Sequence, residues 1–187
     1  MRMRIVARCA TLALSLCLVG SLVLPGVAYA RTGQEIDASV NAALDRFYAK
    51  VRGGQDLVQR SKGVLVFAGV IKAGIGVGGE YGEGALRIGG RTNAYYSIAA
   101  ASIGLQLGAQ KKDIIVVFLE DSALRKFQAS DGWKVGVDGS VVLIDVGANA
   151  SVDSSKINEP IVGFVVGQKG LMYNLTLEGS KISKLKK

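Results

Sequence analysis

The sequence contains no histidine among its 187 residues. A Ser-His-Asp triad and a zinc site with histidine ligands are therefore excluded, which removes most mechanisms used by exported hydrolases. Two acidic pairs remain as candidate catalytic groups, Glu80 with Glu83 and Glu120 with Asp121. On a strand, positions 80 and 83 point to opposite faces, so these carboxylates cannot easily flank one bond. We predict a protein that is not an enzyme and that needs no cofactor or metal.

Cysteine is equally scarce, because the chain has only Cys9 and Cys17. Both lie in a first segment, residues 1–30, where three arginines precede an apolar run and Ala28 and Ala30 form an A-x-A site. This is the pattern of a secretory signal peptide cleaved after Ala30. An uncleaved anchor is the alternative, but the apolar run of residues 9–24 is short for a span of roughly 20 residues. The leucine before Cys17 argues against lipidation.

We therefore predict export, to the periplasm or the outer cell surface. The mature chain, residues 31–187, would form one domain without thiols or disulfides, and no Pro/Ser-rich linker divides it.

Acidic residues are also few, which leaves a formal net charge of +8. Residues 1–30 hold three arginines and residues 181–187 hold four lysines, so 16 basic and 15 acidic residues remain between Arg31 and Ser180. The body is nearly neutral, and the excess charge is a C-terminal tail. Such a tail suits an anionic membrane surface, or it only keeps the protein soluble. A nucleic-acid partner is not predicted, because that would need a basic face with aromatic residues.

The mature chain begins with a predicted amphipathic helix. Thr32 and Glu35 are placed as a capping box, and Gly53-Gly54 provides a stop. The apolar positions at helical spacing are Ile36, Val40, Ala43, Leu44, Phe47 and Val51. We expect this face to pack on a sheet rather than to enter a membrane.

From Lys62 onward the pattern is mostly that of strands, with turn signals at Asp138-Gly139 and at residues 168–170. One further helix is expected in residues 120–130, capped by Asp121 or Ser122. We predict an α+β fold: a mostly antiparallel, strongly bent or barrel-like sheet with an N-terminal amphipathic helix and one short additional helix.

Glycines dominate the stretch "KAGIGVGGEYGEG", residues 72–84, and three of them spell the dinucleotide fingerprint G-x-G-x-x-G. The glycines that follow Gly79 prevent a helix from opening there, so a nucleotide site is rejected. Glycine instead falls on every second position around Gly82, which indicates a strand whose bare face lets a backbone, a helix or a ligand approach. Residues 102–110 repeat this arrangement in short form.

Several long motifs resemble the SYLF domain, a lipid-binding domain of eukaryotic actin-patch and phosphoinositide-binding adaptors and of many exported bacterial proteins. The resemblance covers nearly all of the mature chain, with one departure at Ala68, where the family usually has proline. The motifs are residues 72–74, "GGEYGEG" at 78–84, "GLQLGAQ" at 104–110, the segment 114–127 and "KGLMYNLTLEGS" at 169–180.

The resemblance implies phospholipid binding, with phosphoinositides preferred by eukaryotic members and actin bundled by some. For an exported protein, anionic phospholipids or a membrane surface are the expected partners, peripherally bound, and actin binding is not expected to transfer. The oligomeric state is left open. A structural or self-associating envelope protein without lipid specificity is the alternative, as is an enzyme that uses Glu80 or Glu83.

The predicted lipid-binding residues form two groups. Fixed cations beside the glycine-lined strands would give specificity, unless they merely pair with Glu80 and Glu83. The tail would provide attraction that salt screens. The fixed group is Lys72, Arg87 and Arg91, and the tail group is Lys181, Lys184, Lys186 and Lys187.

Overall fold

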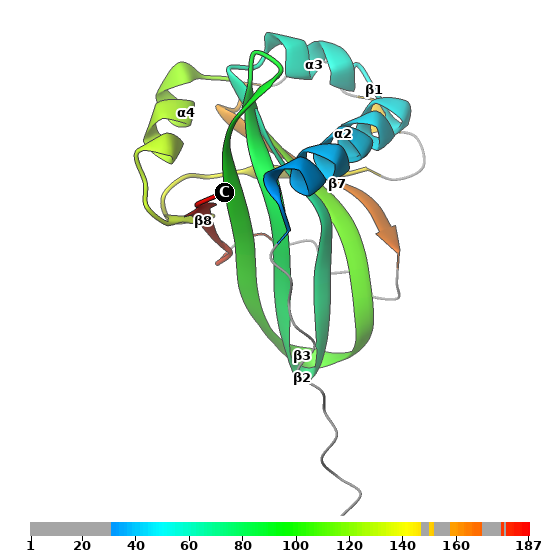
Figure 1. The fold of residues 1–187 in the computed structure, drawn as a ribbon. Coiled ribbons are helices and arrows are strands. Elements are labelled where there is room, and N and C mark those ends of the chain that lie inside the picture. Colours follow the sequence, from blue (N-terminus) through cyan, green and yellow to red (C-terminus); the bar gives the residue numbers. More distant parts are fainter. Residues whose placement is uncertain (1–30, 147–149, 152–157, 170–176, 178) are drawn as a thin grey trace, which may run out of the picture. The chain divides into compact units, whose positions relative to one another are not determined.

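The computed structural model describes residues 31–146, 150–151, 158–169, 177 and 179–187, and it describes no side chains for residues 75–76, 102–109, 145, 150–151 and 168–169. The predicted signal peptide lies outside this range and stays a prediction. The elements, shown in Figure 1, are α2 (Gly33–Lys50), β1 (Val51–Arg52), α3 (Gly54–Arg60), β2 (Gly63–Ile88), β3 (Arg91–Phe118), α4 (Asp121–Gln128), β4 (Trp133–Lys134), β5 (Val142–Val146), β6 (Ala150–Ser151), β7 (Ile161–Lys169) and β8 (Lys181–Leu185).

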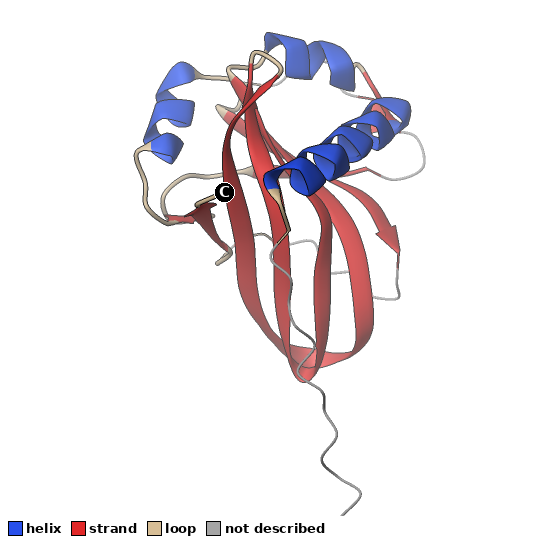
Figure 2. Cartoon of the chain, in the orientation of Figure 1, coloured by secondary structure: helices blue, strands red, loops and turns tan. Residues whose placement is uncertain are grey.

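A single long hairpin, β2 with β3, forms the centre of the fold. Its antiparallel register runs from Gly63 opposite Phe118 to Ile88 opposite Arg91, with irregularities after Phe67, Gly74 and Leu86. The hairpin bends near its middle, so that the two halves of β2 lie beside each other, the two halves of β3 flank them, and the sheet curls into a half-barrel (Figure 2). The glycine-rich stretch is therefore a bent strand.

The bare glycine face allows one half of β2 to lie against the other. A Cβ on Gly84 would overlap the carbonyl oxygen of Val66, and one on Gly82 would come within 2.7 Å of a methyl carbon of Val70. No side chain fits between these two segments of one strand. The backbone that the sequence pattern predicts to approach this face thus belongs to the same strand.

The free edge of β3 is shared by two strands. β8 pairs antiparallel with residues Tyr95–Ala99, and β7 pairs antiparallel with the later part of β3, up to Phe118. β5 adds to β7 in parallel, and β4 adds to β8. The described sheet is therefore mostly antiparallel, and the predicted α+β class is confirmed.

The strand β8 corrects one prediction. Residues 181–187 were expected to be a charged tail, but Ile182 is 2% exposed and packs in the core, because the strand alternates buried and exposed positions. Lys181 and Lys184 are exposed residues of an ordered strand, and Lys186 and Lys187 follow its end.

Helix α2 packs on the outer face of the sheet, as predicted. The capping box is present: the Thr32 hydroxyl accepts from the Glu35 backbone N–H, and the Glu35 carboxylate accepts from the Thr32 backbone N–H at 2.7 Å. The helix ends at Lys50, before the predicted glycines, because Val51 is already extended and pairs in β1. Its buried residues are Ile36, Val40, Ala43, Leu44 and Phe47.

A second core fills the inner face of the half-barrel. Phe127 of α4 lies at its centre, with ring centroids 5.0 Å from both Tyr96 and Phe118 and 5.6 Å from Trp133. The N-cap of α4 is Glu120 without a side-chain cap bond, so the predicted caps, Asp121 or Ser122, are one or two residues late. No helix in the described part of the chain is long and apolar enough to cross a membrane.

Candidate functional site

The three predicted fixed cations do not form one site. Lys72 is 7% exposed and lies near the bend on the inner face, because Val70, two residues earlier, belongs to the inner core. Arg87 lies at the turn end of the hairpin, where its Nη2 is 3.5 Å from Asp37 Oδ1. Arg91 is exposed at the start of β3. The bend separates Lys72 from the two arginines, an outcome that strand spacing alone does not reveal.

The alternative that the fixed cations merely pair with Glu80 and Glu83 is wrong, because both glutamates have other lysines as partners. Glu80 is 6% exposed and its Oε2 lies 3.0 Å from Lys112 Nζ, a pair that the bend brings together across the inner face. Glu83 is 8% exposed and lies on the opposite face, 3.5 Å from Lys187 Nζ. The prediction that they point to opposite faces is correct.

The last lysine links the C-terminus to the start of the domain. Lys187 Nζ donates to the Arg31 carbonyl at 2.5 Å as well as to Glu83. Lys181, Lys184 and Lys186 are exposed. The tail group is therefore divided between one structural lysine and three outward ones.

A basic pocket lies between α2 and the sheet, and sequence reasoning missed it. Its volume is about 400 Å³, and it opens between the middle of α2 and the register shift of β2 after Phe67. Its lining residues are Arg31, Ser39, Ala42, Arg46, Ala68, Gly69, Ile71 and Lys111. Three cations from three separate segments thus converge on one cavity whose lining contains no acidic residue.

Asp113 forms hydrogen bonds to two residues of the pocket lining, Arg46 and Gly69. Its Oδ2 accepts from Arg46 Nε at 2.8 Å, and its Oδ1 accepts from the Gly69 backbone N–H, also at 2.8 Å. Gly69 has φ +67°, a conformation that favours glycine, and it forms the bulge where the β2 register shifts. The sequence signal that could have located the pocket is Asp113 directly before the apolar run of β3, because a buried carboxylate needs hydrogen-bond donors around it.

The other two cations have different surroundings. Arg31 donates to the Ser39 hydroxyl and to the Glu35 carbonyl, which fixes its guanidinium over the first turns of α2. Lys111 is exposed and makes no ion pair within the described residues, and its stem lies against Gly69, where a Cβ would come within 2.8 Å of Cε. Asp113 pairs with Arg46, and the Arg31 charge interacts with Glu35. The lining itself holds three cations and no acidic residue, so the pocket favours anions.

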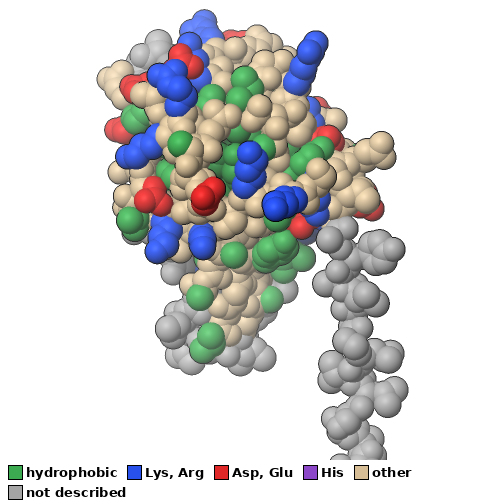
Figure 3. Space-filling model, turned by 60° about the vertical axis from the view of Figure 1, so that its left-hand side comes forward, with side chains coloured by type: hydrophobic (Ala, Val, Ile, Leu, Met, Phe, Trp, Pro, Cys, Tyr) green, Lys and Arg blue, Asp and Glu red, His purple; other side chains and the backbone are tan. Residues whose placement is uncertain are grey.

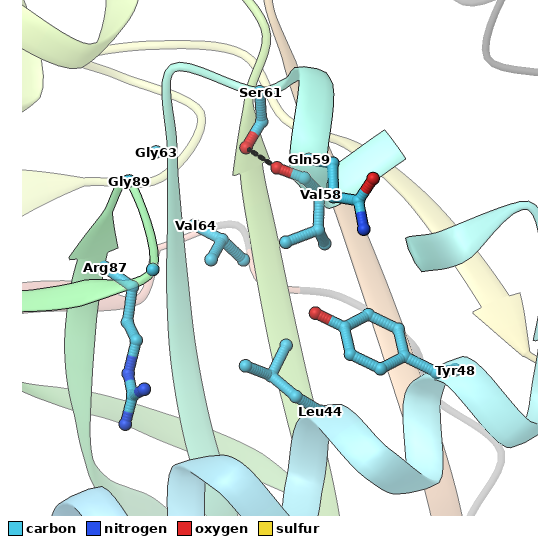
Figure 4. A pocket seen from close by; sticks show the side chains of 10 residues that line it. Leu44, Tyr48, Val58, Gln59, Ser61, Gly63, Val64, Arg87 and Gly89 are labelled. Carbon is cyan, nitrogen blue, oxygen red and sulfur yellow. Dashed lines mark hydrogen bonds between the residues drawn. The ribbon is translucent and has the colours of Figure 1, made fainter. Parts of the chain in front are cut away.

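A second pocket of about 400 Å³ lies between α2, α3 and the hairpin turn (Figure 4). Leu44, Val58 and Val64 form apolar walls, and the Tyr48 hydroxyl points into the space between them. Burial, with a smaller effect of a nearby aspartate, raises the Tyr48 pKa, so the phenol stays neutral. Arg87 is the only cation in this lining and already faces Asp37, so the pocket suits an apolar group better than an anion.

Within the described ranges, no group of three or more acidic side chains is placed to hold a metal ion. The two candidate glutamates are on opposite faces and each has a lysine partner.

Comparison with known proteins finds similarity to one family in the second half of the chain. The model of the Ysc84 family, described as Las17-binding protein actin regulator, matches residues 99–187. An SH3 domain-containing YSC84-like protein 1 from Xenopus laevis is 26% identical over 129 residues, which is 66% of this chain and 38% of the frog protein. The chain thus spans well under half of that relative. The Ysc84 family model thus matches residues 99–187, and the domain it describes is the SYLF domain that the sequence motifs resemble.

Proposed function

We propose that the domain is a non-enzymatic, peripheral membrane protein that binds anionic phospholipid headgroups in the basic pocket. The observation that carries this proposal is the convergence of Arg31, Arg46 and Lys111 on one cavity beside the exposed apolar side chain of Ile71. A phospholipid has this same arrangement, because an anionic phosphate is attached to apolar chains.

The chemistry of the pocket favours phosphate. Arginine and lysine make charge-assisted hydrogen bonds to phosphate oxygens that are roughly twice as strong as neutral ones. Arg46 is oriented by Asp113 and Arg31 by Ser39, so less side-chain entropy is lost when an anion binds. Three cations provide too small a footprint for nucleic acid, whose binding relies on a long row of phosphate contacts.

The outward lysines supply a second, weaker contribution. Lys181, Lys184 and Lys186 are exposed and can attract an anionic surface by up to about 1 kcal/mol each at low salt. This attraction recruits the protein but does not discriminate between headgroups. The finer claims of export and of a periplasmic or outer-surface location rest on the sequence of residues 1–30, and the actin regulation named for the family is not proposed for this chain.

The test compares two charge-matched pairs of substitutions. Vesicles of pure phosphatidylcholine and vesicles of equal parts phosphatidylcholine and phosphatidylglycerol are sedimented with the protein. Arg31→Gln with Lys111→Gln should weaken binding to the mixed vesicles by more than about tenfold, which corresponds to roughly 1.4 kcal/mol. Lys181→Gln with Lys184→Gln, the control, should mainly flatten the salt dependence.

Substitution is preferred to deletion of residues 181–187, since deletion removes the strand β8 and the buried Ile182. Equal losses for the two pairs would mean that net charge alone drives binding, and the pocket would not be the site.

A further inference from the structure

We propose that the uncovered outer face of the bent part of β2 enters the acyl layer of the membrane while the basic pocket holds the headgroup. This face, here called the insertion face, consists of Ile71, Val77 and Tyr81. The inference rests on the proposed function and adds the depth and orientation at which the protein would bind.

The insertion face is a sheet surface without a covering element among the described residues. Ile71 is 53% exposed, Val77 is 70% exposed and Tyr81 is 53% exposed. These three side chains are on the same face of the sheet as α2, which covers another part of that face. Ile71 lines the basic pocket together with α2 residues. Ala85, four residues after Tyr81, packs in the core beneath α2. A neighbouring group of exposed apolar side chains on a soluble domain marks an interaction surface.

The sequence around the bend carries no charge. Residues 73–79 of β2 and residues 92–110 of β3 contain no lysine, arginine, aspartate or glutamate. Figure 3 shows the corresponding division: charged side chains gather on the upper part of the domain, and the described part of the lower projection has only apolar and uncharged groups. Entering hydrocarbon at this end would therefore desolvate no charged side chain of these stretches.

Cations border the insertion face where it meets the rest of the domain. Lys111 lines the same pocket as Ile71, and Lys187 bonds to Glu83, which also accepts from the Tyr81 hydroxyl at 3.1 Å. Burial raises the Tyr81 pKa, and nearby Glu83 raises it further, so the phenol is neutral at physiological pH. A half-exposed tyrosine with an anchored hydroxyl is the type of residue found at the boundary between headgroups and acyl chains.

The backbone is also suited to this environment. From Gly76 opposite Gly104 to Gly84 opposite Tyr96 the two strands of the hairpin are paired without interruption, so the polar groups between them are satisfied within the protein. This pairing, the cation border and the charge-free sequence favour a lipid bilayer as the occupant, since a bilayer offers a phosphate layer directly above hydrocarbon.

The experiment places a tryptophan on the insertion face and a matched one elsewhere. Val77→Trp is the probe and Val137→Trp is the control, because Val137 is 75% exposed but lies in the turn after β4, outside the hairpin. The native Trp133 is 2% exposed and contributes equally to both variants. With mixed vesicles that contain lipids brominated on the acyl chain, fluorescence of the Val77→Trp variant should be quenched and that of the Val137→Trp variant should not.

A second pair tests the energetic contribution. Val77→Asp should weaken binding to the mixed vesicles by at least about tenfold, whereas Val137→Asp, which adds the same charge, should change it less than about twofold. Sedimentation velocity is measured on both variants without lipid. If Val77→Asp instead dissolves an oligomer and leaves vesicle binding unchanged, the face is an interface between copies and the inference is overturned.

The two proposals fail in different ways. Binding that depends on Arg31 and Lys111 without quenching at position 77 would overturn the insertion face and leave the headgroup pocket intact. Absence of binding to any vesicle by the unaltered protein would overturn the proposed function and the insertion face with it.

Discussion

Replacement of Gly84 by alanine should destabilise the domain because the two halves of β2 leave no room for a Cβ. The added carbon would overlap the carbonyl oxygen of Val66 and lie 2.8 Å from Cδ1 of Phe67, and both belong to the buried core strand. Ordinary contact begins near 3.4 Å, so the backbone of one half has to move. Such overpacking costs about 1–3 kcal/mol, occasionally more. Alanine also reduces the conformational entropy of the unfolded chain, which stabilises the folded state by about 0.4–1 kcal/mol.

Because the clash is with a backbone atom, the upper end of the overpacking range applies, and the net loss should be about 2–2.6 kcal/mol in the free energy of unfolding. For a domain of this size, that loss lowers Tm by roughly 4–10 °C. Gly79→Ala is the matched control, since a Cβ there would meet only the Ala100 carbonyl, at 3.9 Å. Urea denaturation followed by circular dichroism measures both variants. Equal stability of the two variants would refute the conclusion that the glycine face exists to let β2 fold against itself.

Three further predictions concern buried polar groups and a cap. Asp113→Ala removes the acceptor of the Gly69 N–H and should lower the free energy of unfolding by about 1–3 kcal/mol, measured by urea denaturation. Glu80→Met should destabilise strongly because it leaves Lys112 buried and unpaired, and adding Lys112→Met should recover most of the loss; a double variant as unstable as the single one would contradict this. Hydrogen bonds at the helix cap lower the pKa of Glu35, so the ionised carboxylate stabilises the fold above about pH 4.5, and this stabilisation is lost as the pH falls through the lower folded pKa. Below pH 4.5, the free energy of unfolding should therefore fall less in Glu35→Gln than in the unaltered protein.

Local features of the fold could be predicted where one short pattern determines them. Thr32 and Glu35 lie three residues apart at the start of an apolar helical stripe, and the capping box forms as that spacing requires. The alternation of glycine with larger residues around Gly82 excluded a helix and predicted a bent sheet with a closely approached face. Neither conclusion required knowledge of distant contacts.

Features that depend on the bend could not be predicted in the same way. Lys112 is the partner of Glu80 only because the hairpin folds back. Arg31, Arg46 and Lys111 come from segments far apart in the sequence, so no spacing of residues predicts that they line one pocket. Residues 181–187 were misjudged because four lysines in seven residues suggest a solvated tail. The alternation around Ile182 is too short to indicate a strand without the edge of β3 to pair with.

The most direct test of the headgroup pocket is an NMR titration with a short-chain phosphatidylglycerol held below its micelle concentration. The amide signals of Gly69 and Lys111 should shift with a single saturating affinity, and those shifts should vanish in the Arg31→Gln, Lys111→Gln variant. Shifts confined to Lys181–Leu185, or to the apolar pocket around Val64, would contradict the account and move the lipid site away from the basic pocket.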